Sequence, residues 1–189
     1  EEFILPSIAN KGPLRLAWFS QNINFERGLE LVLPAVKSHF GKLELHLYGN
    51  VNAEFKKQHL EGIENIFLHG ATAQQQLHKE LFIYDVGLAL EPAKDKNNNL
   101  AISNKILAYL QAGLYVIGTN TKSQYVFMRS FPEMGACFDY KKNDFKEILD
   151  NVLTNMDSIR HNRRERFEKF KNNNWENEST SLLNKWKAL

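Results

Sequence analysis

The sequence predicts an α/β protein that has one doubly wound, mainly parallel β-sheet, helices on both faces of that sheet, and a helical tail at the C-terminus. Two observations support this prediction. Apolar runs of strand length alternate along the chain with segments of helical periodicity, as in consecutive strand–helix–strand crossover units. Two of these runs, 85–91 and 114–119, are almost continuously apolar, which is typical of strands that are covered on both faces.

The first half of the chain is expected to contain three strands, each followed by a helix. The strands are expected at 14–20, 43–49 and 65–70, and the helices at 26–40, 52–60 and 72–81. The segment 43–49 alternates Leu43, Leu45 and Leu47 with polar residues, the pattern of a strand with one wetter face. Pro34 lies inside the first helical pattern and is expected to kink or divide that helix.

The second half continues the alternation after a long irregular stretch that begins at Pro92 and ends at Ile102. Strands are expected at 85–91, 114–119 and, as an edge strand, 136–140; helices are expected at 103–113, 122–131 and 143–156. The helix at 103–113 has a polar start, "SNK", and ends at Gly113, whose freedom at positive φ suits a helix end.

The composition excludes several classes of protein. The chain of 189 residues, with 43% apolar residues and a net charge of +2, suits one globular domain and predicts no nucleic-acid partner. Cys137 is the only cysteine, which excludes an internal disulfide and fits a reducing, cytoplasmic location. No apolar run approaches the roughly 18 residues of a membrane span, and no signal peptide is visible. Because the sequence starts without methionine, we expect a fragment of a longer chain.

Three regions are therefore expected: a linker at 1–13, a ligand-binding domain at 14–156, and helices at 157–189 that pack on the domain. The last region contains the basic sequence "RHNRRERFEKFK", which suits a solvated helix face. The alternative is a basic amphipathic surface that contacts anionic lipid on the inner face of the membrane, or a partner domain. Trp175 and Trp186 indicate that the last helix docks on an apolar surface.

The sheet type predicts where a ligand binds. In an open parallel sheet, ligands bind beyond the carboxyl ends of the strands, where the strand order reverses. The polar or glycine residues at the predicted strand ends are Ser20, Gln21, Tyr48, Gly49, His69, Gly70 and Glu91. A dinucleotide site would need G-x-G-x-x-G after the first strand, but only Gly28 is present there, and no P-loop motif occurs. Phosphate would therefore have to be held by side chains and a helix end.

The start of the helix at 103–113 is the candidate for such an anion site. Ser103 or Asn104 can cap the helix, and Lys105 adds a positive charge beside its unpaired amides. Arg27 would approach from the first helix and hold a second phosphate oxygen. The alternative is an ordinary cap and a solvated lysine, with Arg27 in a surface ion pair with a neighbouring glutamate.

Glu91 ends a buried strand, where an unpaired carboxylate is costly. It would bind a sugar hydroxyl or a base edge, or form a structural ion pair with a residue such as Lys94. The six histidines lack close metal-ligand spacing, and neither C-x-x-C nor G-x-S-x-G occurs, so no metal site is expected and no catalytic residue is identified.

Several segments, in their order and spacing, resemble one known family over roughly residues 14–156. They are "FERGLELVLPAVKSHF", "LELHLYG", "ENIFLHG", "QQQLHKELFIYDVGLALEP" and "SNKILAYLQAGLYVIGT". This series is similar to the C-terminal, donor-binding domain of GT-B glycosyltransferases of the group 1, or family 4, type. The resemblance implies a Rossmann-like half that binds a nucleotide sugar, a separate N-terminal domain that binds the acceptor, and transfer without a bound metal or cofactor.

The resemblance also implies roles for particular residues. "ERG" is similar to the family's lysine-glycine, which makes Arg27, beside Gly28, a phosphate ligand. His69 and Gly70 match the segment near the base, and residues 103–105 fall at the helix start that faces the sugar diphosphate. The chain departs from the family at Leu100 and Ala108, where two glutamates are common, and near Asn22, where an arginine is common.

Two functions follow as hypotheses. The first is the donor-binding half of a hexosyltransferase that uses a UDP- or GDP-sugar in polysaccharide or glycoconjugate biosynthesis, with the isolated fragment inactive because the acceptor half is absent. The second is a non-catalytic α/β protein-interaction domain with a vestigial nucleotide crevice, which the missing glutamates favour.

Overall fold

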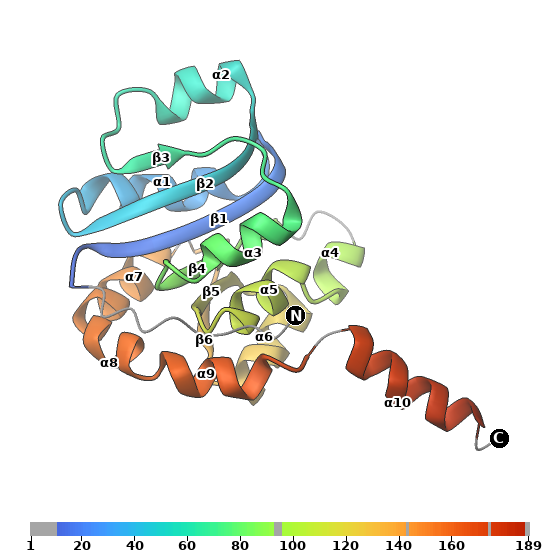
Figure 1. Cartoon of the computed structure of the whole chain (residues 1–189). Coiled ribbons are helices and arrows are strands. Elements are labelled where there is room, and N and C mark those ends of the chain that lie inside the picture. Colours follow the sequence, from blue (N-terminus) through green and yellow to red (C-terminus); the bar gives the residue numbers. More distant parts are fainter. Residues whose placement is uncertain (1–10, 93–95, 143, 174, 188–189) are drawn as a thin grey trace.

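The computed structural model describes residues 11–92, 96–142, 144–173 and 175–187, and it contains a six-stranded parallel sheet with helices on both faces (Figure 1). The strands are β1 (Leu14–Ile23), β2 (Leu43–Val51), β3 (Ile66–Leu68), β4 (Val86–Ala89), β5 (Tyr115–Thr119) and β6 (Gly135–Phe138). Their order in the sheet is β3-β2-β1-β4-β5-β6, and every neighbouring pair is parallel. The prediction of a doubly wound, open α/β sheet is thus confirmed, and the strand order reverses between β1 and β4.

The helices of the domain follow the strands in alternation. They are α1 (Leu29–Ser38), α2 (Ala53–Phe55), which continues as the π-helical turn η1 (Lys56–Leu60), α3 (Gln74–Leu81), α4 (Lys96–Leu100), α5 (Asn104–Gln111), α6 (Lys122–Ser130) and α7 (Phe145–Thr154). Three more helices complete the described chain: α8 (Met156–His161), α9 (Arg163–Phe170) and α10 (Trp175–Lys187).

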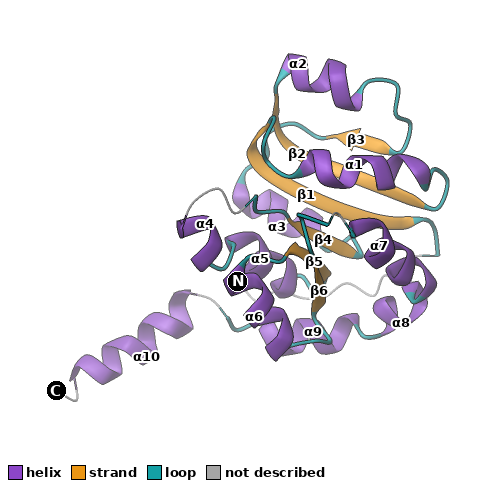
Figure 2. Ribbon diagram, turned by 180° about the vertical axis from the view of Figure 1, so that it is seen from behind, coloured by secondary structure: helices purple, strands orange, loops and turns teal. Residues whose placement is uncertain are grey.

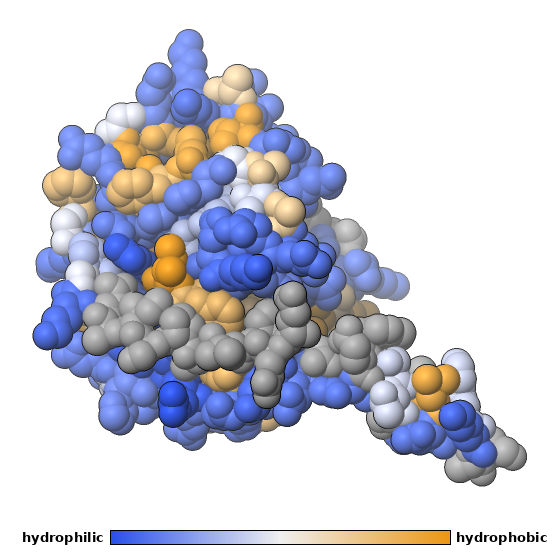
Figure 3. Space-filling model, viewed as in Figure 1, coloured by the Kyte–Doolittle hydropathy of each residue, from blue (hydrophilic) through white to orange (hydrophobic). Residues whose placement is uncertain are grey.

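The two faces of the sheet bury two separate apolar clusters. Helices α1 and α7 cover one face, seen from behind in Figure 2, where buried residues such as Leu16, Leu45 and Leu149 pack together. Helices α3, α5 and α9 cover the other face, where Tyr109 and Phe167 are buried. Apolar side chains also reach the surface near the edge strand β3, where Phe67 is 39% exposed (Figure 3).

Several elements differ from the prediction in extent. Strand β1 continues to Ile23 instead of ending at residue 20, with an irregular register between Phe19 and Asn22. Helix α1 starts at Leu29, and Pro34 does not divide it, because buried apolar residues on both sides of the proline hold the helix to the sheet. The stretch predicted as irregular contains the short helix α4. The linker expected at 1–13 lies outside the described residues, apart from its last three.

Three arginines of the C-terminal segment bond to groups of the domain. The Arg160 guanidinium pairs with Asp85 at the start of β4 (2.9 Å), and Arg163 and Arg166 donate to the carbonyls of Ala112 and Gly113 at the end of α5. These bonds hold α8 and α9 against the domain. Helix α10 extends away from it (Figure 1), and Trp186 is 63% exposed; the side chain of Trp175 lies outside the described part. None of the described helices is both long enough and apolar enough to cross a membrane.

Candidate functional site

A cavity of about 460 Å³ opens at the carboxyl end of the sheet, beside the point where the strand order reverses. It is bordered by the end of β1, by Glu91 two residues after β4, by helix α4 and by the start of α5. The structure brings six of the predicted site residues to this cavity: Ser20, Gln21, Glu91, Ser103, Asn104 and Lys105. Its volume lies in the range of roughly 300 to 1,000 Å³ that is typical of small-molecule sites.

The irregularity of β1 places Ser20 and Gln21 at the cavity. The register of β1 against β2 shifts between Phe19 and Asn22, so the residues between them leave the regular ladder. Gly49 on β2 makes room for this shift: it has a φ of +142°, and a Cβ at this position would lie 2.1 Å from the Ser20 carbonyl oxygen. Gly49 itself therefore supports the wall of the cavity without lining it.

The Glu91 carboxylate binds both Ser103 and Lys105 at the border of the cavity. Its Oε1 accepts hydrogen bonds from Ser103 Oγ (2.9 Å) and Lys105 Nζ (3.0 Å), and the side chains of Glu91 and Lys105 are each 19% exposed. The backbone of Glu91 is fixed by Thr119 at the end of β5: the Glu91 amide donates to Thr119 Oγ1 (3.0 Å), which donates to the Glu91 carbonyl (2.8 Å). The carboxylate is therefore a fixed anchor for the lysine.

The amino end of α5 faces the same cavity. Ser103 is its N-cap, and the Ser103 hydroxyl accepts from the Lys105 amide at 3.4 Å. The helix is held in place by Tyr109, whose ring lies against Gly87 of β4 and whose hydroxyl donates to the Leu88 carbonyl (3.2 Å). Complete burial raises the pKa of Tyr109 well above its usual value, so the phenol stays neutral.

The charges of this arrangement are nearly balanced. Glu91 and Lys105 are the charged residues among the described lining, and their formal charges cancel. An entering anion would therefore meet the amide end of α5, which carries about half a positive charge, together with a lysine that is already shared with a carboxylate. Such a site suits a ligand that offers both an anionic group and hydroxyl groups, because the carboxylate needs donors when the lysine turns to the anion.

Arg27 and Gly28 lie next to the cavity but do not line it. The loop between β1 and α1 passes close to the residue before Glu91, since a Cβ on Gly28 would lie 2.9 Å from Leu90 Cβ. Arg27 is exposed in this loop, and within the described part of the chain its side chain has no hydrogen bond or ion pair. The surface ion pair considered as the alternative for Arg27 is thus absent there. Lys94, considered as the partner of Glu91, lies outside the described residues.

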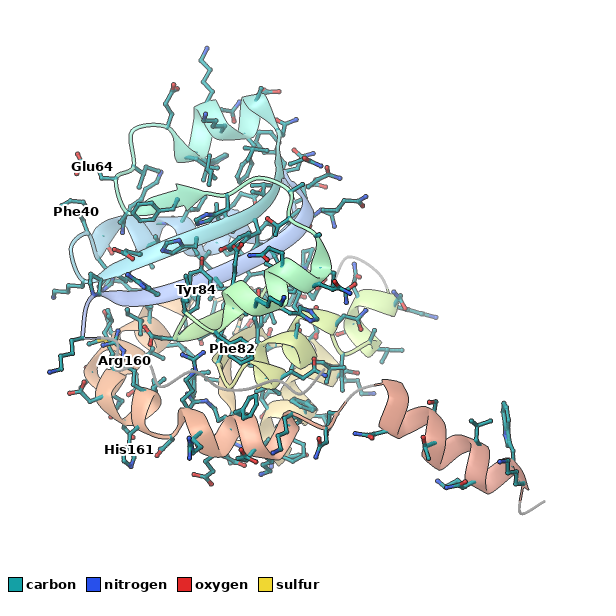
Figure 4. All side chains as sticks on the ribbon, in the orientation of Figure 1. Phe40, Glu64, Phe82, Tyr84, Arg160 and His161 are labelled. Atoms are coloured by element: carbon teal, nitrogen blue, oxygen red, sulfur yellow. The ribbon has the colours of Figure 1, made fainter. Side chains whose placement is uncertain are left out.

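Tyr48, His69 and Gly70 are grouped elsewhere, at the β2–β3 side of the sheet. The Tyr48 hydroxyl is 2.5 Å from that of Tyr84, which Figure 4 labels, and the His69 ring stacks on Tyr48 with centroids 4.5 Å apart. His69 Nε2 also lies 2.8 Å from His46 Nδ1. Burial raises the pKa of Tyr48 and lowers the pKa of His69, so both groups favour their neutral forms.

The sequence prediction missed the contribution of α4. Asn97 and Asn98 line the cavity, and Asn99 fastens the helix by accepting a hydrogen bond from the Lys122 amide (2.9 Å). The sequence signal for α4 is weak, because a run of three asparagines is equally typical of a solvated loop. Among the described residues no three His, Cys, Asp or Glu side chains are grouped closely enough to hold a metal ion.

The strand order, the cavity at the reversal point and the helix end together define a Rossmann-like, doubly wound architecture. No protein-family model and no curated protein matches the sequence. Solved structures do match, and those reported below are of glycosyltransferases or related enzymes and share this fold with the chain.

Three of the matches illustrate the likeness. Sucrose-phosphate synthase from Thermosynechococcus elongatus superposes with a TM-score of 0.68 at 14% identity, over 94% of this chain and 45% of that one. The C-terminal domain of a group 1 family glycosyl transferase from Francisella tularensis gives a TM-score of 0.63 at 13% identity, with 84% and 85% covered. The catalytic domain of cholesterol-α-glucosyltransferase from Helicobacter pylori gives 0.62 at 15% identity, with 86% and 99% covered.

The coverage shows what part of such a protein the chain corresponds to. The chain spans less than half of the sucrose-phosphate synthase and 37% of the matched chain in the GtfA/B complex, but most of the structure that was solved as a C-terminal domain. The chain therefore has the fold of the C-terminal, Rossmann-like half of a GT-B glycosyltransferase, as the sequence resemblance predicts.

Proposed function

We propose that this chain is the donor-binding half of a glycosyltransferase and binds a nucleotide-diphospho-sugar, a UDP- or GDP-sugar, in the cavity between β1 and α5. The observation that carries the proposal is the combination, at one crevice, of a capped helix start, a lysine and a fixed carboxylate. A sugar diphosphate has an anionic part and a hydroxyl-rich part, and this set of groups suits both.

The expected binding mode assigns each group a task. The diphosphate lies against the amides at the start of α5, where the helix dipole favours negative charge. Lys105 turns from Glu91 to a phosphate oxygen, and Glu91 then accepts hydrogen bonds from sugar hydroxyls. Arg27, exposed in the neighbouring loop, approaches a second phosphate oxygen. The placement of His69 and Gly70 near the base, which the resemblance implies, stays a prediction, as does the role of Tyr48 as a site residue at a strand end.

The same groups would assist transfer of a hexosyl group to an acceptor of polysaccharide or glycoconjugate biosynthesis. As the glycosidic bond to the diphosphate breaks, negative charge develops on the leaving oxygen, and the helix end and Lys105 would stabilise it without a metal ion. We expect the acceptor to bind an N-terminal domain of the parent chain, so that the fragment alone binds the donor but transfers no sugar.

The expected location is the cytoplasm, with peripheral contact to the inner face of the membrane through the basic C-terminal segment as an addition. Fewer cations are free for that contact than the sequence suggests. Arg160, Arg163 and Arg166 bond to groups of the domain and Lys171 pairs with Glu168 (2.7 Å), whereas Arg164 is exposed at the surface.

A thermal-shift measurement tests the proposed function against a non-catalytic interaction domain. A nucleotide present at 100 times its dissociation constant stabilises the folded state by about 2.7 kcal/mol, which raises the melting temperature of a domain of this size by roughly 5 to 11 °C. We expect this shift with UDP or GDP and a smaller one with ADP. Absence of a shift with all three nucleotides at millimolar concentration would favour the interaction domain.

A further inference from the structure

A second cavity lies at the opposite edge of the sheet from the proposed donor site. It has a volume of about 260 Å³ and is bordered by Tyr115 at the start of β5, by Glu133 before β6, and by α7, α8 and α9. Because the strands are parallel, the start of β5 and the carboxyl end that carries the first cavity lie at opposite edges of the sheet. The two cavities are thus separate.

This second cavity contains a buried cation that lacks a matching anion. Arg166 is 2% exposed; its Nε donates to the Gly113 carbonyl (3.0 Å) and its Nη2 to the Ile159 carbonyl (2.6 Å). Its Nη1 has no hydrogen-bond partner, and no carboxylate lies within 4.0 Å of the guanidinium, in the described part of the chain. The guanidinium also lies over the Tyr115 ring, 5.9 Å from its centroid. Burial lowers the pKa of Arg166 to about 10, so a charge that no carboxylate balances is costly to the folded protein.

The remaining lining is mixed: Tyr115, Val152 and Ile159 are apolar or aromatic, whereas the asparagines and Ser158 are polar. Ser158 is exposed on α8, and Asn162 is exposed between α8 and α9; their side chains make no hydrogen bond to the described residues. Glu133 adds a negative charge at the border of the cavity, but it forms an ion pair with Lys169, which offsets that charge. The formal charge of the cavity with this pair is therefore +1, contributed by Arg166.

We propose that this cavity is a second ligand site that takes a small oxyanion, a carboxylate or a phosphate ester, on the Arg166 guanidinium. A guanidinium binds such groups through charge-assisted hydrogen bonds. The cavity is larger than a phosphate ion alone, so the hydroxyl and amide groups at its border can bind further polar atoms of the ligand. This site does not depend on the proposed donor-binding function.

The test is a ¹⁵N NMR titration with two probes, inorganic phosphate and sodium acetate, at constant ionic strength. The Arg166 Nε–H signal and the backbone amides of Ser158 and Asn162 should shift and saturate with at least one probe. Ser158→Asp places a negative charge at the cavity on an exposed position of α8 and should raise the dissociation constant at least tenfold. The matched control is Gln58→Asp, on the exposed surface of η1, which should leave it unchanged.

Arg166 itself is left intact, because its bonds to two carbonyls hold α8 and α9 to the domain and its replacement would disturb the fold. Saturation with phosphate alone would support a phosphate-ester ligand, and saturation with acetate would support a carboxylate. The proposal is overturned when neither probe gives saturable shifts at these residues, or when the dissociation constants of both variants are equal. Shifts confined to the start of α5 would also overturn it, while leaving the donor-site proposal standing.

Discussion

At the scale of single residues, the proposed activity depends on one carboxylate, Glu91. The sequence marks it as unusual because it ends a buried strand, where an unpaired charge is unfavourable. The sequence does not predict its partners, since Ser103 and Lys105 reach Glu91 only through the placement of α5 across the sheet. Lys105 already pairs with Glu91 in the structure, so we expect this pair to oppose the proposed binding of a diphosphate.

We expect Glu91→Gln to bind UDP more tightly than the unchanged protein. The amide keeps the shape of the side chain but removes a negative charge near the diphosphate and frees Lys105, so the dissociation constant should fall by up to about tenfold, or about 1.4 kcal/mol. Calorimetric titration measures this change. Glu64→Gln, an exposed position labelled in Figure 4, is the control and should have no effect. Weaker UDP binding by Glu91→Gln would show that the carboxylate does not oppose the diphosphate.

At the scale of elements, the site depends on how closely α5 packs on β4. Gly87 allows this contact, because a Cβ on it would lie 2.2 Å from the Tyr109 ring. The ring in turn fixes the helix whose amino end faces the cavity. Neither residue is singled out by the sequence pattern: the glycine is one member of an apolar run, and the tyrosine occupies an ordinary buried helix position.

Gly87→Ala should therefore destabilise the domain and displace α5. Overpacking of a tight core typically costs 1 to 3 kcal/mol, and this backbone-facing ring has little room to move, so we expect about 3 kcal/mol in urea unfolding. Gly118→Ala on the neighbouring strand is a matched control, because its Cβ would meet its nearest atom at 3.6 Å, an ordinary contact. Equal stability of the two variants would contradict the importance of this packing.

The sequence predicts the elements better than their ends. Alternation of apolar runs and helical patterns identifies all six strands of the sheet, and the signal is strongest for β4 and β5, which are buried on both faces. It misses the register shift in β1, which requires the glycine of the neighbouring strand, and the helix α4, which is short and polar. Both missed features border the cavity, and both arise from contacts between segments distant in the chain rather than from local preference.

At the scale of the whole molecule, the C-terminal segment closes the domain from the edge opposite the proposed donor site. Periodicity and charge in the sequence identify helices there but do not reveal which arginines turn inward. Arg160 does so by pairing with Asp85, whose side chain is 3% exposed, and by donating to the carbonyls of Gly12 and Pro13. One side chain thus joins the start of the first strand, the start of β4 and α8.

Arg160→Ala should lower the free energy of unfolding by about 3 to 5 kcal/mol, because it leaves the buried Asp85 carboxylate without its cation, although the hydrogen bond from the Arg15 amide remains. Arg164→Ala, in the same segment but exposed, should change it by less than about 0.5 kcal/mol. Urea unfolding followed by circular dichroism measures both. Similar values for the two variants would mean that the C-terminal helices contribute little to the stability of the domain.

The most direct test of the central claim is the calorimetric titration of UDP and GDP into the protein and its Lys105→Ala variant. Loss of a charge-assisted hydrogen bond, typically about 1.5 to 3 kcal/mol, predicts at least about tenfold weaker binding of the preferred nucleotide with no loss of fold; Arg27→Ala should show a smaller decrease. Lys122→Ala, at the start of α6, is the matched control and should bind normally. Unchanged affinity in both Lys105→Ala and Arg27→Ala would contradict donor binding at this cavity.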